Sequence, residues 1–453
     1  MNYDEFLISK KISHTASGHD DIAPPWLFDW QQAVTKWSIK KGRAALFMDT
    51  GLGKTPCQLA WADSVVRNEN KPALILAPLA VAQQTERMAR KFGVEAHYVR
   101  ESNGLKKAIN ITNYERFHKF SGCEFSGVVL DESSILKSFM GKTKRALMQE
   151  YKNTKYKLCC TATPSPNDQM EILNQADFLG IMQSSKALAI WFINDTMNFG
   201  NYRLKKHGID DFYRWVSTWA VGMERPSDIG YSDDGYNLPP LRIHDIIIDV
   251  DDTIDAGDNL FRIPEMSATT YNREKRKTLS DRVEKCAEIS NASDEQFLTW
   301  CELNDESREL ARAMKDSVEI SGSDPIEKKE AAAIAFMDGD IRVLISKPSI
   351  FGFGLNFQQC HKEIFCGLSY SYENYYQAVR RVYRFGQTSP VDIYSVIAHT
   401  EKNTLGIIKR KADEHISAKA YMKNELNYAN GIEYKMEYGQ NEKITMPAFI
   451  RGE

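Results

Sequence analysis

The sequence predicts an α/β protein made of two parallel-sheet domains in tandem, with a helical insertion in or after the first. The chain has 453 residues, which is too long for a single hydrophobic core. Short apolar runs of strand length alternate with helical stretches up to about residue 165, and the alternation restarts after about residue 240. Because such alternation places helices on both faces of a parallel sheet, each half predicts one domain of this kind.

The first domain is predicted over residues 1–167. Its apolar runs each end at Pro, Thr, Asn or Asp, which is typical of strands that lead into loops. Helical stretches at 55–67 and 81–92 lie between these runs. The predicted strands are ALILAP (73–78), INIT (109–112), GVVLD (127–131) and KLCCTATP (157–164).

Residues 168–240 are predicted to form a helical insertion followed by a linker. Trp, Phe and Met occur in helical sequence here, and Gly, Asp and Ser are enriched at 225–236. The second domain is predicted over 241–453, where a tail after about residue 420 has little periodicity, so that docked and frayed tails are both open. Its predicted strands are RIHDIIIDV (242–250), FLTWCEL (297–303), IRVLIS (341–346), EIFCGLS (363–369) and VDIYSVIA (391–398).

Composition restricts the classes of protein to which the chain can belong. It is 42% hydrophobic and 26% charged, and its net charge of −3 argues against a protein that coats nucleic acid by charge alone. Eight cysteines form no Cys-x-x-Cys pair, so no zinc site is predicted and the thiols are expected to be reduced, as in a cytoplasmic protein. No apolar run approaches the roughly 18 residues of a membrane span, so no membrane partner is expected.

The stretch FMDTGLGKTP (47–56) follows an apolar run and precedes a helical one. Gly51 and Gly53 allow the backbone to turn its N–H groups inward around phosphate oxygens. Lys54 can reach the terminal phosphates, and the hydroxyl of Thr55 can bind Mg²⁺. The stretch therefore predicts a site for ATP and Mg²⁺.

A pair of carboxylates, Asp131 and Glu132, ends the apolar run GVVLD. Adjacent carboxylates at the end of a strand suit two tasks, in which Asp131 binds Mg²⁺ and Glu132 positions or deprotonates an attacking water. Because the pair lies between the Lys54 loop and a Thr-Ala-Thr-Pro turn at 161–164, the order of the motifs favours nucleotide hydrolysis.

Taken together, these motifs resemble the superfamily 2 helicases and translocases of the Swi/Snf type, and the chain is similar to the small members that bacteriophages encode. The resemblance covers about residues 26–165 and 295–405, and it implies two RecA-like domains. It also implies that Gln31 in LFDWQQ reads adenine and that Gly352, Gly354 and Asn356 in SKPSIFGFGLNF face the nucleotide. ITNYE resembles a segment that touches the DNA backbone, so that Thr112 and Asn113, with Ser346, are candidate DNA contacts.

The resemblance also names residues that couple hydrolysis to DNA. They are Thr161 and Thr163 of the TATP turn, Gln377 of QAVRRVYRFGQ, and Ser134, which stands in DESS where a histidine is usual. QAVRRVYRFGQ implies that Arg381 and Arg384 are arginine fingers, which reach across from the second domain to the γ-phosphate. Arg380 stands where the family usually has Asp, and we expect no catalytic role for it.

The predicted function is a DNA-dependent ATP hydrolase, a translocase or helicase whose two domains couple hydrolysis to movement on double-stranded or branched DNA. Its contacts are expected to be with the DNA backbone and independent of base sequence. One alternative is an RNA helicase of the DEAD-box type. Against it, the last motif ends in Arg-Phe-Gly-Gln, whereas the corresponding motif of that group ends in Arg-x-Gly-Arg. The other is an ATP-gated DNA-binding scaffold that recruits a partner such as a nuclease.

Overall fold

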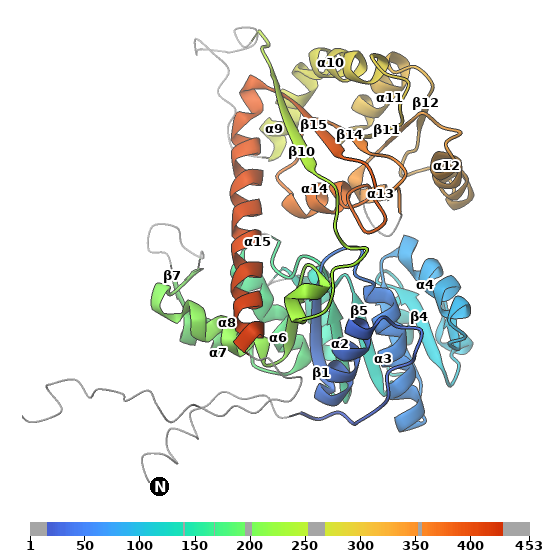
Figure 1. The fold of residues 1–453 in the computed structure, drawn as a ribbon, viewed down its shortest axis with the longest axis vertical. Coiled ribbons are helices and arrows are strands. Elements are labelled where there is room, and N and C mark those ends of the chain that lie inside the picture. Colours follow the sequence, from blue (N-terminus) through green and yellow to red (C-terminus); the bar gives the residue numbers. More distant parts are fainter. Residues whose placement is uncertain are drawn as a thin grey trace, which may run out of the picture.

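The computed structural model describes residues 16–138, 141–166, 168–194, 202–251, 268–351 and 356–428. Figure 1 shows two α/β domains, one above the other, with the C-terminal helix alongside both. The predicted fold class, two RecA-like parallel-sheet domains in tandem, is confirmed by the two sheets described below.

The first sheet has seven strands in the order β3-β4-β2-β5-β6-β1-β9, and every pair in it is parallel. All four strands predicted for this domain are present. The strands are β1 (Arg43–Met48), β2 (Ala73–Ala77), β3 (Ala96–Tyr98), β4 (Ile109–Asn113), β5 (Gly127–Asp131), β6 (Tyr156–Cys160) and β9 (Ala220–Met223).

Helices cover both faces of this sheet, which explains why its strands are apolar throughout. Side chains that alternate along a strand enter different cores: Leu74 and Leu76 of β2 pack with one cluster, and Ile75 with the other. On the Ile75 face lie α2 (Asp29–Lys41), α3 (Lys54–Glu69) and α4 (Leu79–Lys91). On the opposite face lie α5 (Lys142–Glu150), α6 (Ile172–Leu179), α7 (Ser184–Trp191) and α8 (Ile209–Ser217).

The stretch 168–240 contains the predicted helices α6, α7 and α8, and it also contains elements that the sequence did not predict. Strand β9 pairs with β1 at the edge of the first sheet, and the nitrogen of Ala45 donates to the oxygen of Trp219 at 2.9 Å. A short antiparallel hairpin is formed by β7 (Phe192–Asn194) and β8 (Tyr202–Leu204). The aromatic residues of this stretch thus complete the core of the first domain, and the domain boundaries given above stay predictions.

The second sheet has six strands in the order β10-β15-β14-β11-β13-β12, again all parallel. All five strands predicted for this domain are present. The strands are β10 (Leu241–Ile248), β11 (Phe297–Trp300), β12 (Ser317–Glu319), β13 (Val343–Ser346), β14 (Lys362–Cys366) and β15 (Val391–Ala398). The helices that accompany them are α9 (Ala268–Lys277), α10 (Leu279–Asn291), α11 (Asn304–Ala313), α12 (Ile326–Asp338), α13 (Pro348–Phe351) and α14 (Tyr372–Val379).

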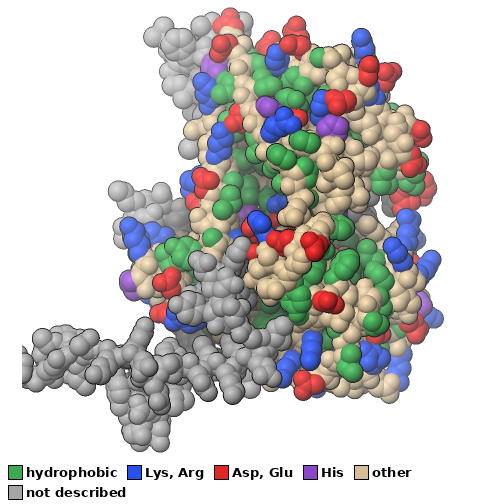
Figure 2. Space-filling model, viewed as in Figure 1, with side chains coloured by type: hydrophobic (Ala, Val, Ile, Leu, Met, Phe, Trp, Pro, Cys, Tyr) green, Lys and Arg blue, Asp and Glu red, His purple; other side chains and the backbone are tan. Residues whose placement is uncertain are grey.

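The last helix, α15 (Lys402–Tyr428), follows β15 of the second domain and runs down to α8 and β9 of the first. The described part of the predicted tail after about residue 420 is therefore helical. Positive and negative side chains are interspersed on the face shown in Figure 2, in keeping with the small net charge. All eight cysteines are free thiols, and all but Cys123 are buried. Within the part of the chain that the structure describes, no helix has the length and apolar character needed to cross a membrane.

Replacing Trp219 with Ala should lower the free energy of unfolding by about 3–5 kcal/mol, because a large buried side chain is removed from the core beneath β1. Trp219 is fully buried, and its ring packs edge-on against that of Phe47 at 6.0 Å. Denaturant unfolding followed by circular dichroism measures the loss. Ile22→Ala is the control, since Ile22 is 88% exposed. A loss for Trp219→Ala no larger than that of the control would contradict the assignment of this residue to the core.

Candidate active site

The loop between β1 and α3 contains the predicted phosphate-binding residues. Gly51 and Gly53 have φ angles of 86° and 71°, a left-handed conformation that favours glycine. A Cβ atom on Gly53 would lie 2.3 Å from Nε2 of Gln31, and one on Gly51 would lie 3.0 Å from the backbone nitrogen of Phe385 in the second domain. Both glycines are therefore required by backbone conformation and by the close approach of neighbouring groups.

Lys54 begins α3 directly after this loop, and its Nζ donates to the backbone oxygens of Met48 at 3.0 Å and Asp49 at 3.3 Å. Thr55 is the second residue of the helix. The helix start provides N–H groups, and with the Lys54 ammonium it forms a surface suited to phosphate oxygens. Gln31, the predicted adenine reader, lies against the same loop because its Nε2 donates to the oxygen of Leu52 at 3.2 Å.

The predicted carboxylate pair lies at the carboxyl end of β5, next to β6 and two strands from β1. Asp131 is buried, and its Oδ1 accepts a hydrogen bond of 2.7 Å from Nε2 of Gln58 in α3. Glu132 has a φ angle of 56°, a left-handed conformation that is uncommon for a residue with a side chain. The turn directs its Oε2 toward Oγ1 of Thr161, which donates at 3.2 Å.

Burial sets the protonation of the pair. The pKa of Glu132 is raised to about 7, chiefly by burial, with the Lys54 ammonium lowering it and the charge of Asp131 adding to the increase. Burial also raises the pKa of Asp131. A carboxylate that titrates near neutral pH can accept a proton from water and release it again, which is the property a general base needs.

The donors present fit a Mg²⁺ ion. Oxygen ligands from Asp131 and Thr55 suit a hard cation, and Oε1 of Gln58 is a further buried oxygen that has no hydrogen-bond partner within the described residues. The described residues include no group of three or more His, Cys, Asp or Glu side chains that could bind a metal. Mg²⁺ at a nucleotide site needs fewer protein ligands, because phosphate oxygens and waters complete its shell.

The DESS and TATP segments are also linked through a residue that sequence reasoning missed. Oγ of Ser133 donates to Oε1 of Gln175 at 2.7 Å, and Nε2 of Gln175 donates to the oxygen of Pro164 at 2.8 Å. The predicted coupling residue Ser134 is buried beside this link. Thr161 accepts a hydrogen bond from the nitrogen of Thr163 at 3.1 Å. Gln175 lies in α6, and no local motif marks it.

The second domain places the predicted arginines against this site. Arg381 is buried, and burial with the nearby charge of Arg384 lowers its pKa to about 9, while the charges of Glu132 and Glu363 act in the opposite direction. Its guanidinium donates to the backbone oxygen of Gln377 at 2.9 Å and to Oε1 of the same residue at 3.1 Å. The structure thus brings the Arg381 charge close enough to Glu132 for the two to interact across the domain boundary.

Arg384 lies at the predicted phosphate-binding loop itself, residues 49–54, which is called the phosphate loop below. Its Cβ is 3.7 Å from the position that a Cβ atom on Gly51 would take, and burial lowers its pKa to about 10. Lys137, which follows DESS, pairs with the buried Glu373 of α14. Contacts between the two domains therefore surround the residues predicted to hydrolyse ATP, and the catalytic roles themselves stay predictions.

Burial argues against the three predicted DNA contacts. Thr112 and Ser346 have no exposed surface and Asn113 has 1%, because they lie in the last two residues of β4 and the last residue of β13, inside covered sheets. Oγ of Ser346 donates to the oxygen of Ile320 at 2.9 Å, and Nδ2 of Asn113 donates to the Tyr98 hydroxyl at 3.4 Å. These side chains do not reach the surface, where a phosphate backbone would lie.

Of the residues predicted to face the nucleotide from the second domain, only Asn356 can be placed. Its Nδ2 donates to Oε1 of Gln358 at 3.1 Å. Gly352 and Gly354 lie outside the described residues.

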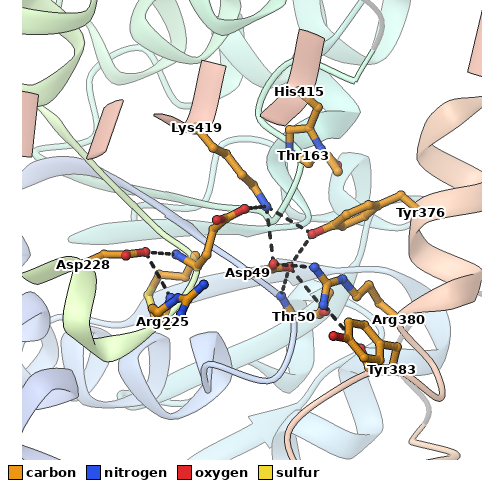
Figure 3. Close-up of polar contacts among 12 residues, drawn as sticks. Asp49, Thr50, Thr163, Arg225, Asp228, Tyr376, Arg380, Tyr383, His415 and Lys419 are labelled. Atoms are coloured by element: carbon orange, nitrogen blue, oxygen red, sulfur yellow. Dashed lines mark hydrogen bonds and ion pairs between the residues drawn. The ribbon is translucent and has the colours of Figure 1, made fainter. Parts of the chain in front are cut away.

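Arg380, for which the sequence predicted no role, forms a buried ion pair between the domains. Its Nη2 donates to Oδ2 of Asp49 in the phosphate loop at 2.8 Å, and their side chains are 17% and 5% exposed. Figure 3 shows the Asp49 carboxylate at the centre of this group of polar contacts. The sequence carried one signal of this ion pair, because Arg380 stands where the resemblance implies an acidic residue. Its partner Asp49 lies in the loop already predicted to bind phosphate.

Comparisons with known proteins find similarity over the second domain and over most of the chain. Residues 275–386 match the family model of the helicase conserved C-terminal domain, a region that includes Arg381 and Arg384. The chain is 22% identical over 456 residues to putative protein p41 of Acyrthosiphon pisum secondary endosymbiont phage 1, covering 83% of this chain and 93% of the phage protein.

Two further matches are more partial or more distant. The chain is 28% identical over 173 residues to Protein CHROMATIN REMODELING 19 of Arabidopsis thaliana, covering 31% of this chain and 23% of the plant protein. Among solved structures, the Sulfolobus solfataricus SWI2/SNF2 ATPase core in complex with dsDNA aligns with a TM-score of 0.43 and 17% identity, over 91% of this chain and 97% of that chain.

Glu132→Gln should stabilise the fold at about pH 8 and lose this advantage at about pH 5. The folded state raises the Glu132 pKa to about 7, so folding disfavours the charged carboxylate that exists above this pKa. A neutral amide removes that cost, with a gain of about 1–2 kcal/mol at the higher pH. Thermal unfolding at the two pH values measures the difference. A gain that is equal at both would contradict the raised pKa.

Proposed function

We propose that this chain is a superfamily 2 helicase of the Swi/Snf type and that it couples ATP hydrolysis between its two domains to movement on DNA. The observation that carries the proposal is the meeting of charges at the domain boundary. Lys54, Asp131 and Glu132 come from the first domain, and Arg381 and Arg384 approach them from the second. Neither half contains a complete set of hydrolytic groups by itself.

Each group has a distinct chemical task. Lys54 and the N–H groups of the loop bind the phosphates, and Gln31 orients the base. Asp131 and Thr55 would hold Mg²⁺, which neutralises charge on the phosphate oxygens when it is bound. Glu132 accepts a proton from the attacking water, and its pKa of about 7 suits that transfer.

The arginines link hydrolysis to the relative position of the domains. A guanidinium that neutralises charge on the transferring phosphoryl group favours the transition state over bound ATP. Hydrolysis thus requires the closed arrangement, and loss of the γ-phosphate weakens it. Repeated closing and opening gives a cycle that can be converted into steps along a polymer.

DNA as the polymer is supported by the relatives. The plant protein is named for chromatin remodelling, and its match with this chain is 28% identical. Swi/Snf-type members hold an intact duplex by its backbone, so binding should be independent of sequence and weakened by salt. Because Thr112, Asn113 and Ser346 are buried, we expect other side chains to make these contacts.

The ATPase rate should rise more with duplex DNA than with single-stranded DNA, RNA or no polymer. Movement should be visible as displacement of a third strand from a DNA triplex, because a motor on a duplex removes what lies in its path. Lys54→Ala should abolish both signals, since the phosphates lose their cation. Stimulation by RNA alone would favour an RNA helicase. DNA binding that is gated by ATP without third-strand displacement would favour a scaffold.

Arg381→Ala and Arg384→Ala should each lower kcat for ATP hydrolysis by about 10²–10⁴-fold, with little change in ATP affinity, because a finger acts mainly in the transition state. Lysine should substitute poorly at either position, since an ammonium lacks the fork of the guanidinium. Steady-state kinetics with saturating duplex DNA give both constants. Arg312→Ala is the control, because Arg312 is 73% exposed on α11. Losses of similar size at all three positions would contradict the finger assignment.

A further inference from the structure

The C-terminal helix α15 belongs to the second domain by sequence but packs on the first. It contacts α8 and β9, and the ring of Tyr421 stacks on that of Tyr213 at 5.3 Å with an interplanar angle of 2°. Figure 1 shows the helix alongside both domains over its whole length. It therefore forms a second connection between the domains, far in sequence from the linker that ends near residue 240.

Helix α15 delivers a buried cation to the phosphate loop. Lys419 is 8% exposed, and its Nζ lies 3.4 Å from Oδ2 of Asp49 and 3.4 Å from Oε1 of Glu224. It also donates to the hydroxyl of Tyr376 in α14 at 3.2 Å. One ammonium thus contacts the phosphate loop, the stretch after β9 and the helix that precedes the arginine motif.

Asp49 is the common partner in this group (Figure 3). It is bound by Arg380 at 2.8 Å, by Lys419 and by the Tyr376 hydroxyl, and its Oδ1 accepts from the nitrogen of Thr50 at 2.6 Å. Burial alone would raise the pKa of Asp49, but the charges of Arg380 and Lys419 hold it well below its usual range. Asp49 is thus a carboxylate whose charge is maintained by two cations from the second domain.

This group also touches the predicted phosphate-binding residues. The backbone oxygen of Asp49 accepts from Nζ of Lys54 at 3.3 Å, and Thr50 is the next residue of the loop. A shift of the Asp49 carboxylate would therefore move the backbone that cradles the phosphates. The contacts of Asp49, Lys54 and Lys419 described here are all made between residues of this chain.

We propose that Arg380 and Lys419 are positioning residues for the hydrolysis, which act through Asp49 to hold the phosphate loop in its working shape against the second domain. This inference rests on the proposed ATPase function. It makes α15 a required part of the hydrolytic site, because without the helix the Asp49 carboxylate loses one of its two cations. It also replaces the expectation that Arg380 has no part in the reaction.

The arrangement predicts how substitutions combine. Removing one cation leaves a buried carboxylate with half of its compensation, whereas removing the carboxylate deprives both cations of the same partner. Arg380→Ala and Asp49→Asn should therefore be strongly non-additive, and the double variant should resemble the worse single one. Independent residues would give losses that multiply.

The kinetic test measures kcat and KM for ATP at saturating duplex DNA. Arg380→Ala and Lys419→Met should each lower kcat about 10–100-fold with a smaller change in KM, since the ATP contacts themselves remain. Lys419→Arg should retain most of the activity because it keeps the charge. Arg410→Ala is the matched control, because Arg410 lies on the same helix with its side chain 67% exposed. This variant should hydrolyse ATP at the normal rate. Normal kcat in both Arg380→Ala and Lys419→Met would overturn the proposal.

A second measurement needs no hydrolysis and separates this proposal from the proposed function. Hydrogen–deuterium exchange of the nucleotide-free full chain reports opening of the phosphate loop, residues 49–54. Exchange there should be about 10-fold faster in Arg380→Ala and Lys419→Met than in the parent chain or Arg410→Ala. If Lys419→Met does not fold, Arg380→Ala decides the result. Unchanged exchange in this loop would overturn the positioning role even in an active ATPase, and faster exchange would support it even in an inactive one.

Discussion

The two domains meet at a buried boundary where carboxylates of the first domain require cations from the second. Asp49 and Glu132 lie at the carboxyl edge of the first sheet, where parallel strands deliver their loops together. A buried carboxylate without compensation is costly, so the second domain can cover this edge favourably because Arg380, Lys419 and Arg381 face the carboxylates. The relative position of the domains is thereby tied to the residues that would contact the nucleotide.

Compensation differs between the two carboxylates, and so does the chemistry that each can perform. Asp49 faces two cations and a phenol, which hold its pKa low and keep it charged. Glu132 has weaker compensation, and burial raises its pKa to about 7. One fold thus keeps a structural carboxylate permanently ionised and leaves another free to exchange a proton, because their partners differ.

Most of the fold could be predicted because both sheets are parallel and covered, and apolar runs such as ALILAP and VDIYSVIA mark buried strands directly. Strand β9 was missed, since its four residues are no more apolar than the helices around them. The phosphate loop and the carboxylate pair were recognisable because their chemistry depends on neighbours in sequence. The candidate DNA contacts Thr112, Asn113 and Ser346 are buried, which the sequence did not indicate, since polar side chains at strand ends do not reveal whether a neighbouring strand or loop covers them.

What local motifs could not supply comes from distant parts of the chain. Ser134 stands where the resemblance implies a histidine, yet an imidazole does lie near the TATP turn: the side chain of His415 from α15 lies beside Thr163 in Figure 3. Burial and the charge of Lys419 lower its pKa to about 3, so that it is neutral, and its Nδ1 is 2.9 Å from the Tyr372 hydroxyl. A backbone interaction with Ala162 in the turn opposes these effects and raises the pKa of the same imidazole. Helix α15 therefore brings a cation to the phosphate loop and an imidazole to the TATP turn from one face, two groups that no motif within the first domain encodes.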